Sequence, residues 1–150
     1  MIQNIRIDRI DELEDGSLLF IDYKSGQQHQ NKWLTPRMEE PQLPLYLISN
    51  DSGKKASGIA FAKLNHNDPG YTGIGNSDNI APGIIHCARE TKNNRFEPDW
   101  EKQINLWQED LSMLAKDFLA GNFLVDPKNK SKTCEYCNFQ KLCRIQEISN

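Results

Sequence analysis

The pattern of apolar and polar positions at the start of the chain predicts two β-segments, over residues 4–11 and 17–24. Residues 14–16, Glu-Asp-Gly, lie between them and are a tight-turn signal, so we expect an antiparallel hairpin. Residues 18–21, Leu-Leu-Phe-Ile, are apolar at every position, which is typical of a strand covered on both faces. The second segment is therefore predicted to be a buried central strand.

Shorter apolar runs predict the next elements. Residues 25–40 are polar and are expected to form a loop, and residues 42–48 follow as a short helix, since proline is tolerated in a first helical turn. Residues 57–64 and 83–88 look like strands. Residues 65–82 are rich in Asn, Asp and Gly without a period, which predicts a mobile loop.

The strongest helical period in the chain runs from about Pro98 to Ala120, and Gly121 supplies a stop signal after it. Apolar residues recur there at steps of four and three: Trp100, Ile104, Trp107, Leu111, Leu114 and Phe118. An apolar stripe at helical spacing is usually a core face, so we expect the tryptophans in the core and not in a base-stacking platform. No repeat or linker interrupts the pattern, which favours one α/β (α+β) domain over residues 1–150.

Charge and composition narrow the class of protein. The formal net charge of −3 gives no global basic field, so a nucleic-acid partner has to be argued from a site. No run approaches the roughly 18 apolar residues that span a bilayer, and the first residues lack signal-peptide features. We expect a soluble, cytoplasmic protein with no membrane partner. Three of the four cysteines crowd the C-terminus, which suits metal or cluster ligation in a reducing compartment.

Charged residues on the hairpin suggest a metal site. Side chains alternate along a strand, so Asp22 and Lys24 share a face at the end of a buried strand. Asp8 can lie opposite Asp22, because each of them lies seven positions along the chain from Asp15 in the turn. Two close carboxylates repel unless a cation lies between them, and oxygen ligands favour Mg²⁺ or Mn²⁺. Lys24 could then orient or help deprotonate an attacking water, or offset charge on a pentacovalent phosphate.

An alternative interpretation remains for the same residues. Asp8, Asp11 and Lys24 could form a solvated charge ladder of the kind that protects exposed hairpins. Strict alternation places Asp11 on the face opposite to Asp8, so Asp11 either serves the structure or is turned towards the site by a bulge.

Four ordered motifs resemble a known family. Residues 6–11 (Arg-Ile-Asp-Arg-Ile-Asp), the following Asp-Gly turn and residues 21–26 (Ile-Asp-Tyr-Lys-Ser-Gly) resemble the RecB-type (RecB/AddB-like) nuclease domain of the PD-(D/E)XK superfamily. Residues 41–46 (Pro-Gln-Leu-Pro-Leu-Tyr) are similar to its Gln-x-x-x-Tyr motif, and the match reaches the C-terminal cysteines. One Asp-x-Lys is a weak signal, whereas four motifs in order are a strong one.

The resemblance implies a fold and an activity. It implies a restriction-endonuclease-like mixed sheet flanked by helices, and a Mg²⁺- or Mn²⁺-dependent deoxyribonuclease, an exonuclease of bacterial DNA repair or recombination. Asp8 and Asp22 would ligate the metal, the main-chain carbonyl of Tyr23 would add a ligand, and Lys24 would be the catalytic lysine. The alternative function is a non-catalytic metal- or DNA-binding module.

Gln42 and Tyr46 lie four residues apart and share a face of the expected helix. By resemblance they support the lysine and contact DNA. Without it, Tyr46 would more often be a packed aromatic residue and Gln42 a polar group at the start of a helix.

Cys134, Cys137 and Cys143 place three thiols within ten residues, close enough to converge on one ion or cluster. The alternative is three unrelated thiols in a short tail. Related bacterial nucleases hold a [4Fe–4S] cluster with three such cysteines and one far upstream. Cys87 lies in the wrong place to match that fourth ligand, and we expect it to be a small buried hydrophobe.

The family's leading helix and first core strand have no counterpart in the sequence. We therefore interpret residues 1–150 as an N-terminally truncated nuclease domain with a cysteine-cluster tail over 126–150, belonging to a longer chain whose upstream domains are helicase-like. On this hypothesis the cluster is incomplete and the isolated chain is weakly active or inactive. No role is assigned to His29, His66 or His86.

Basic residues gather at three places, and a subset is expected to contact the phosphate backbone of DNA. These groups are Lys54 with Lys55, then Arg89, Lys92 and Arg95, then Lys128, Lys130 and Lys132.

Overall fold

The computed structural model describes residues 6–35, 37–66, 68–89, 97–144 and 147. It divides into two compact units, Met1–Ser112 and Met113–Asn150, which are described separately. Within the described residues, no helix combines the length and the apolar character needed to cross a membrane.

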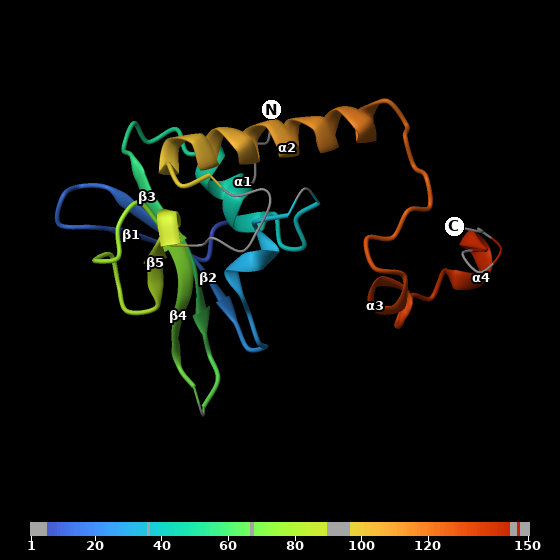
Figure 1. The fold of residues 1–150 in the computed structure, drawn as a ribbon, viewed down its shortest axis with the longest axis horizontal. Helices are drawn as coiled ribbons and strands as arrows, with labels where there is room; N and C mark the ends of the chain where they lie inside the picture. Colours follow the sequence, from blue (N-terminus) through green and yellow to red (C-terminus); the bar gives the residue numbers. More distant parts are fainter. Residues whose placement is uncertain (1–5, 36, 67, 90–96, 145–146, 148–150) are drawn as a thin grey trace. The chain divides into compact units, whose positions relative to one another are not determined.

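The first unit is built on a five-stranded sheet whose spatial order follows the chain (Figure 1). Its strands are β1 (Arg9–Glu12), β2 (Leu18–Lys24), β3 (Ala56–Lys63), β4 (Gly70–Gly75) and β5 (Ile84–His86). The pairs β1–β2 and β3–β4 are antiparallel, whereas β2–β3 and β4–β5 are parallel. The helices are η1 (Gln30–Lys32), α1 (Gln42–Ile48), η2 (Cys87–Arg89), α2 (Trp100–Leu119), α3 (Lys130–Cys134) and α4 (Gln140–Cys143). The expected mixed sheet with flanking helices is confirmed.

The hairpin forms around the predicted turn. Gly16 has a φ of +79°, which glycine adopts without a steric cost, and Leu13 N donates to Ser17 O at 2.8 Å. The register pairs Arg9 with Ile21. The first strand is shorter than the predicted 4–11, because it begins only at Arg9, and residues 4 and 5 lie outside the described part of the chain.

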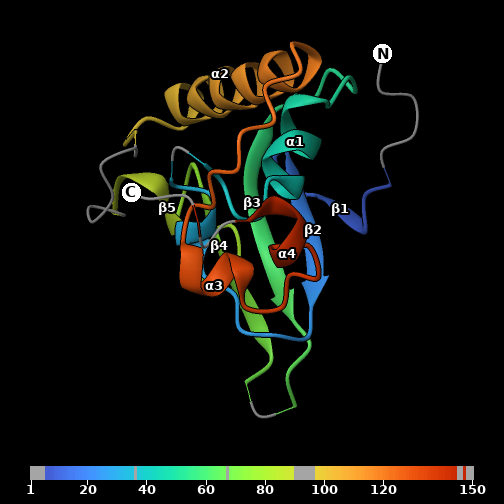
Figure 2. The ribbon, with the colours of Figure 1, turned by 90° about the vertical axis from the view of Figure 1, so that its right-hand side faces the viewer.

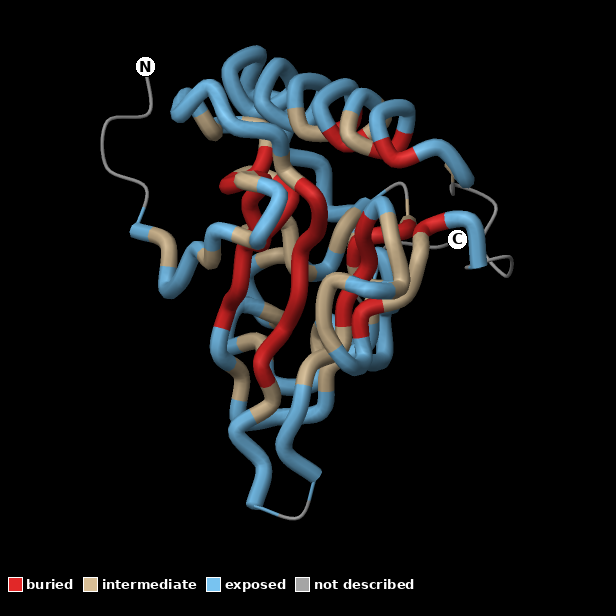
Figure 3. Tube along the Cα trace, turned by 90° about the vertical axis from the view of Figure 1, so that its left-hand side faces the viewer, coloured by how far each residue is buried: buried red, intermediate tan, exposed pale blue. Residues whose placement is uncertain are grey.

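Strand β2 is buried on both faces, as predicted, because every residue from Leu18 to Asp22 is buried. Figure 3 shows long buried runs within the sheet. Phe20 belongs to a cluster that includes Leu43 and Leu47 of α1, whereas Ile21 packs in a second cluster with Ala60. We call the face that carries Phe20 the α1 face. This helix makes its sheet contacts with β2 and β3.

The prediction of a mobile loop over 65–82 is wrong at Gly70–Gly75, which forms β4. The glycines that suggested a loop are required by the close approach of β3. A Cβ on Gly73 would lie 2.4 Å from Ile59 O, and one on Gly75 would lie 2.4 Å from Ser57 O. Glycine composition therefore reflects the contact between two backbones here.

The segment 25–40 is largely irregular, as expected, but it also contributes to the core. Trp33 and Leu34 are both buried, and the Trp33 ring stacks on Phe61 with centroids 4.4 Å apart. Trp107 Nε1 donates to Trp33 O at 2.9 Å, which ties this segment to α2. The polar neighbours of Trp33 and Leu34 concealed this packing in the sequence.

Helix α2 ends as predicted. Gly121, with a φ of +76°, follows it, and Asn122 N donates to Asp117 O at 3.0 Å, which satisfies a carbonyl of the last turn. The expectation of a core-packing helix holds only for its first half. Trp100 and Trp107 are buried, whereas the second half, which belongs to the second unit, leaves its apolar residues exposed, including Leu114 and Phe118.

Candidate metal centre

Strand β2 brings two charged side chains to the edge of the α1 face. Asp22 and Lys24 follow Phe20 at alternate positions, so all three point to this face. Asp22 is only 2% exposed, and its Oδ2 lies 2.9 Å from Lys24 Nζ. A buried charge loses its solvation by water, so it needs a close partner of opposite charge.

Asp8 lies where the hairpin arithmetic predicts. It immediately precedes β1, and one further step of the Arg9–Ile21 register places it opposite Asp22. Tyr23 N donates to Asp8 Oδ2 at 3.2 Å, and the carboxyl groups of Asp8 and Asp22 interact directly. The two carboxylates that the motifs single out therefore meet in space.

The two charges at the end of β2 have displaced pKa values. Burial raises the pKa of Asp22; its hydrogen bond and attraction to Lys24 oppose that rise, whereas Asp8 adds to it. The hydrogen bond to Asp22 raises the pKa of Lys24, so this lysine is held as an ammonium group. The arrangement favours the charge-offsetting role for Lys24 over the role of a base.

Glu40 is a further charged neighbour that the sequence motifs did not identify. Its Oε2 lies 3.8 Å from Lys24 Nζ, and its Oε1 lies 3.5 Å from Lys32 Nζ. Lys32 Nζ in turn donates to Gln28 Oε1 at 2.8 Å. The only sequence signal was a pair of glutamates before α1, which we interpreted as charge at a helix start.

Gln42 and Tyr46 share a face of α1, as predicted. Gln42 Nε2 donates to Tyr46 Oη at 2.5 Å, and Tyr46 is buried in the core cluster of the α1 face. Within the described residues, neither side chain hydrogen-bonds to Lys24. The hydrogen bond therefore links the side chains of Gln42 and Tyr46 to each other.

Tyr23 and Asp11 belong to the opposite face of the hairpin. The Tyr23 side chain is 40% exposed, and its hydroxyl accepts from Arg9 Nη1 at 3.2 Å, so Tyr23 could serve the site only through its main chain. Asp11 Oδ1 pairs with Arg9 Nε at 2.6 Å. Of the two alternatives for Asp11, the geometry matches the structural one.

The cysteines of the tail have free, half-buried thiols: Cys134, Cys137 and Cys143. Phe139 N donates to Cys137 Sγ at 3.4 Å. Throughout the described part of the chain, no three His, Cys, Asp or Glu side chains converge in a way that could hold a metal ion. Cys87 is fully buried in the first unit, where its Sγ donates to Pro98 O at 3.0 Å and burial raises its pKa.

Two of the histidines serve local turns. His29 Nδ1 accepts from Asn31 N at 3.2 Å at the start of η1, and His86 Nδ1 accepts from Ala88 N at 2.9 Å. Both contacts are local to the turn in which each histidine lies.

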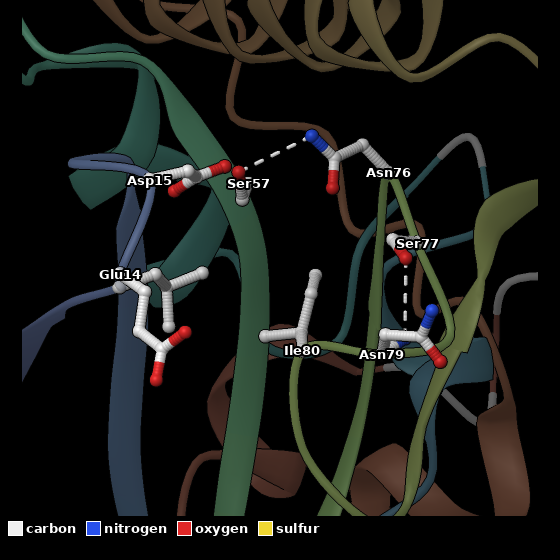
Figure 4. A pocket seen from close by; sticks show the side chains of 8 residues that line it. Glu14, Asp15, Ser57, Asn76, Ser77, Asn79 and Ile80 are labelled. Carbon is white, nitrogen blue, oxygen red and sulfur yellow. Dashed lines mark hydrogen bonds between the residues drawn. The ribbon is translucent and has the colours of Figure 1, made fainter.

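A cavity of about 440 Å³ lies at the other end of β2 and β3 (Figure 4). Hydrogen bonds run along its wall from Asn76 to Ser57, from Ser57 to Ser17 and from Ser17 to Asp15. Both serine hydroxyls find partners within the protein, and the contact with Ser17 lowers the pKa of Asp15. The network joins the hairpin turn to β3 and β4, and none of the candidate site residues lines this cavity.

Comparison with known proteins points to one family. The model of the PD-(D/E)XK nuclease superfamily matches residues 6–144, which include both carboxylates of the hairpin, helix α1 and the three cysteines of the tail. Proteins of this superfamily are generally metal-dependent nucleases, and they typically use divalent ions such as Mg²⁺. No curated protein and no solved structure gives a significant match.

Proposed function

Because the chain belongs to the PD-(D/E)XK nuclease superfamily, we propose that it is a DNA exonuclease that uses Mg²⁺ or Mn²⁺. The observation that carries the proposal is the meeting of Asp8, buried Asp22 and Lys24 at one end of β2. The exonuclease activity and a role in DNA repair or recombination in the cytoplasm rest on the RecB-type order of the motifs.

The donor set fits a hard divalent cation. Asp8 and Asp22 offer carboxylate oxygens, and the Tyr23 main-chain carbonyl would add a third. The raised pKa of Asp22 reflects a buried negative charge that Lys24 only partly compensates, as expected where a cation completes the site. A cation bound there would supply an activated water and would neutralise charge at the scissile phosphate.

Lys24 has a defined task in this proposal. Its ammonium group contacts both Asp22 and Glu40, so two carboxylates help to position it. From there it would donate to a phosphate oxygen and offset the charge that grows as water attacks. Gln42 and Tyr46, joined by their hydrogen bond, would support Lys24 and contact the DNA.

We propose that the tail cysteines ligate a [4Fe–4S] cluster or another metal, and that helicase-like domains act as partners of the nuclease. The support is the spacing of Cys134, Cys137 and Cys143, with the hydrogen bond that Cys137 Sγ accepts from Phe139 N. Three thiols are one fewer than such a cluster usually takes, so no catalytic step is assigned to it.

End-labelled linear DNA tests the proposed activity. Wild-type chain should degrade it with Mg²⁺ or Mn²⁺ and leave it intact in EDTA, and Asp22→Asn should lower the rate by about a thousandfold or more. Asp11→Asn is the matched control, because it removes a carboxylate from the opposite face of the same hairpin. Its rate should stay close to that of the wild type.

Three results would contradict the proposal. Equal cleavage by wild type and Asp22→Asn would remove the assigned site. Cleavage of circular single-stranded DNA would exclude a strict exonuclease. DNA or metal binding without any cleavage would favour the non-catalytic module.

A further inference from the structure

The second unit differs from the rest of the chain in charge. Residues 113–150 carry six Lys and Arg residues against four Asp and Glu residues, whereas the whole chain has a net charge of −3. All six basic side chains are exposed, and five of them lie between residues 128 and 144. A local cationic surface on an acidic protein is suited to a polyanion.

Within this unit, residues 129–144 form an internally connected scaffold, which Figure 2 shows as α3 and α4 joined by a turn. The Asn129 side chain caps α3 by accepting from Lys132 N at 3.1 Å. Gln140 Nε2 donates to Cys134 O, and Cys137 N donates to the same carbonyl at 3.2 Å. These contacts hold α4 against the end of α3.

Two aromatic rings project from this scaffold. Tyr136 is 86% exposed and Phe139 is 66% exposed, although each is flanked by residues that form the contacts of the scaffold. In a small structural element, aromatic rings of this kind are normally buried against its other residues. Exposed Lys130 and Lys132 precede the two rings along the same short segment, and exposed Lys141 follows them.

We propose that residues 129–144 bind single-stranded DNA, with bases stacked on Tyr136 and Phe139 and phosphates beside Lys130, Lys132 and Lys141. Every unpaired base offers a face to an aromatic ring, whereas the bases of a duplex are already stacked on each other. The positive charge favours this occupant over a second copy of the chain, which is acidic as a whole. The inference rests on the proposed nuclease function and adds a place where a single-stranded substrate is held.

The inference is tested by binding of a labelled oligonucleotide of about 16 nucleotides, the upper end of the range that one single-strand-binding OB fold covers. Fluorescence anisotropy is measured with the full chain in EDTA, so that cleavage does not interfere. The double variant Tyr136→Leu and Phe139→Leu keeps the apolar bulk but removes the ring faces, and we expect its affinity to fall by about tenfold or more. Phe123→Leu is the matched control, because Phe123 is also an exposed ring of this unit but lies outside the segment.

Charge is tested separately. The double variant Lys130→Gln and Lys132→Gln should lower the slope of log affinity against log salt by about 1.4, because each single-strand phosphate contact contributes roughly 0.7. This pair keeps the inference testable if the leucine variant loses its folded structure, as judged by circular dichroism.

Unchanged single-strand affinity in a folded leucine variant would overturn the inference, as would an equal loss of affinity for duplex DNA. If sedimentation shows that the wild type self-associates and the Tyr136 and Phe139 variant does not, with DNA binding unaffected, the surface is assigned to a second copy of the chain. Cleavage by the wild type is measured in parallel with Mg²⁺. Loss of binding in the variants, combined with no cleavage by the wild type, would contradict the proposed function alone. Cleavage by the wild type, combined with unaltered binding in the variants, would contradict this inference alone.

Discussion

Asp22 combines near-complete burial with a carboxyl group whose pKa is raised. Among the described residues, its charged partners are Lys24 and Asp8, and the lysine does not fully offset the loss of solvation. A buried carboxyl group of this kind is expected to lower the stability of the fold, and groups with displaced pKa values are common at catalytic sites.

Asp22→Asn is therefore expected to stabilise the protein in EDTA. Because the folded-state pKa is raised, the wild-type fold gains most when Asp22 is protonated, and it loses that advantage as the pH rises from the ordinary carboxyl range through the raised pKa. Urea unfolding should show the variant to be more stable than the wild type by about 1 kcal/mol near pH 7.5, with the difference shrinking as the pH falls towards about 4, the ordinary pKa of an Asp side chain. A less stable variant at neutral pH would contradict this account, and Asp11→Asn should show no gain.

Glu40 is expected to position Lys24, since it contacts both Lys24 and Lys32. Glu40→Gln removes the second carboxylate that contacts the ammonium group of Lys24. Steady-state cleavage should show kcat lowered by roughly tenfold or more, with KM changed little, because partners that orient a catalytic group typically have effects of this size. Glu39→Gln, at an exposed neighbour, is the control; equal losses in both variants would indicate a general effect of charge.

At the scale of elements, β4 shows how a glycine-rich segment can be a strand. It pairs with β3 from Gly58 opposite Gly75 to Lys63 opposite Gly70. Strand β3 therefore has β2 on one side and β4 on the other. The candidate site depends on this sheet, because β3 is the parallel neighbour of the strand that carries Asp22 and Lys24.

Gly73→Ala should destabilise the fold by about 1–3 kcal/mol, since its Cβ would meet Ile59 O and Ala60 at distances that require the backbone to shift. Denaturant unfolding measures the loss. Gly26→Ala is the matched control, because nothing lies within 4 Å of its Cβ and its φ is not positive, so it should be neutral or slightly stabilising. Equal effects of the two substitutions would argue against the close approach of β4 to β3.

At the scale of the whole molecule, metal binding should couple to unfolding. A cation held by Asp8 and Asp22 in the folded state stabilises that state by mass action, by about 2.7 kcal/mol at a concentration one hundred times the Kd. Thermal unfolding should show Mg²⁺ raising the Tm of the wild type and of Lys24→Met, which keeps both carboxylates, but not that of Asp22→Asn. A similar rise in Asp22→Asn would place the bound metal elsewhere.

The cysteine tail gives a second prediction at this scale. Three thiols lie in the second unit, and Cys87 is buried in the core of the first, so we expect less than one complete cluster in the anaerobically purified chain. Iron and acid-labile sulfide analysis measures it. A stoichiometric cluster, lost in Cys137→Ser, would contradict this expectation.

The sequence by itself determined the hairpin and the main residues of the candidate site. A turn at Gly16 and strict alternation along two short strands are local properties, and together they place Asp8 opposite Asp22 and Lys24 beside it. The continuous apolar run in β2 likewise predicts its burial. The end of α2 follows from Gly121 alone, because a residue with positive φ terminates the helix.

Only the tertiary structure decided the features that depend on partners distant in the sequence. Gly73 became part of a strand because β3 approaches it closely, and Trp33 became a core residue because Phe61 and Trp107 surround it. The contacts of Glu40 with Lys24 and Lys32 arise because the chain folds back beside β2, and no local spacing encodes that approach. A short-range pattern sets the backbone geometry of a segment, but the neighbours that the rest of the chain brings to it determine its packing and electrostatic environment.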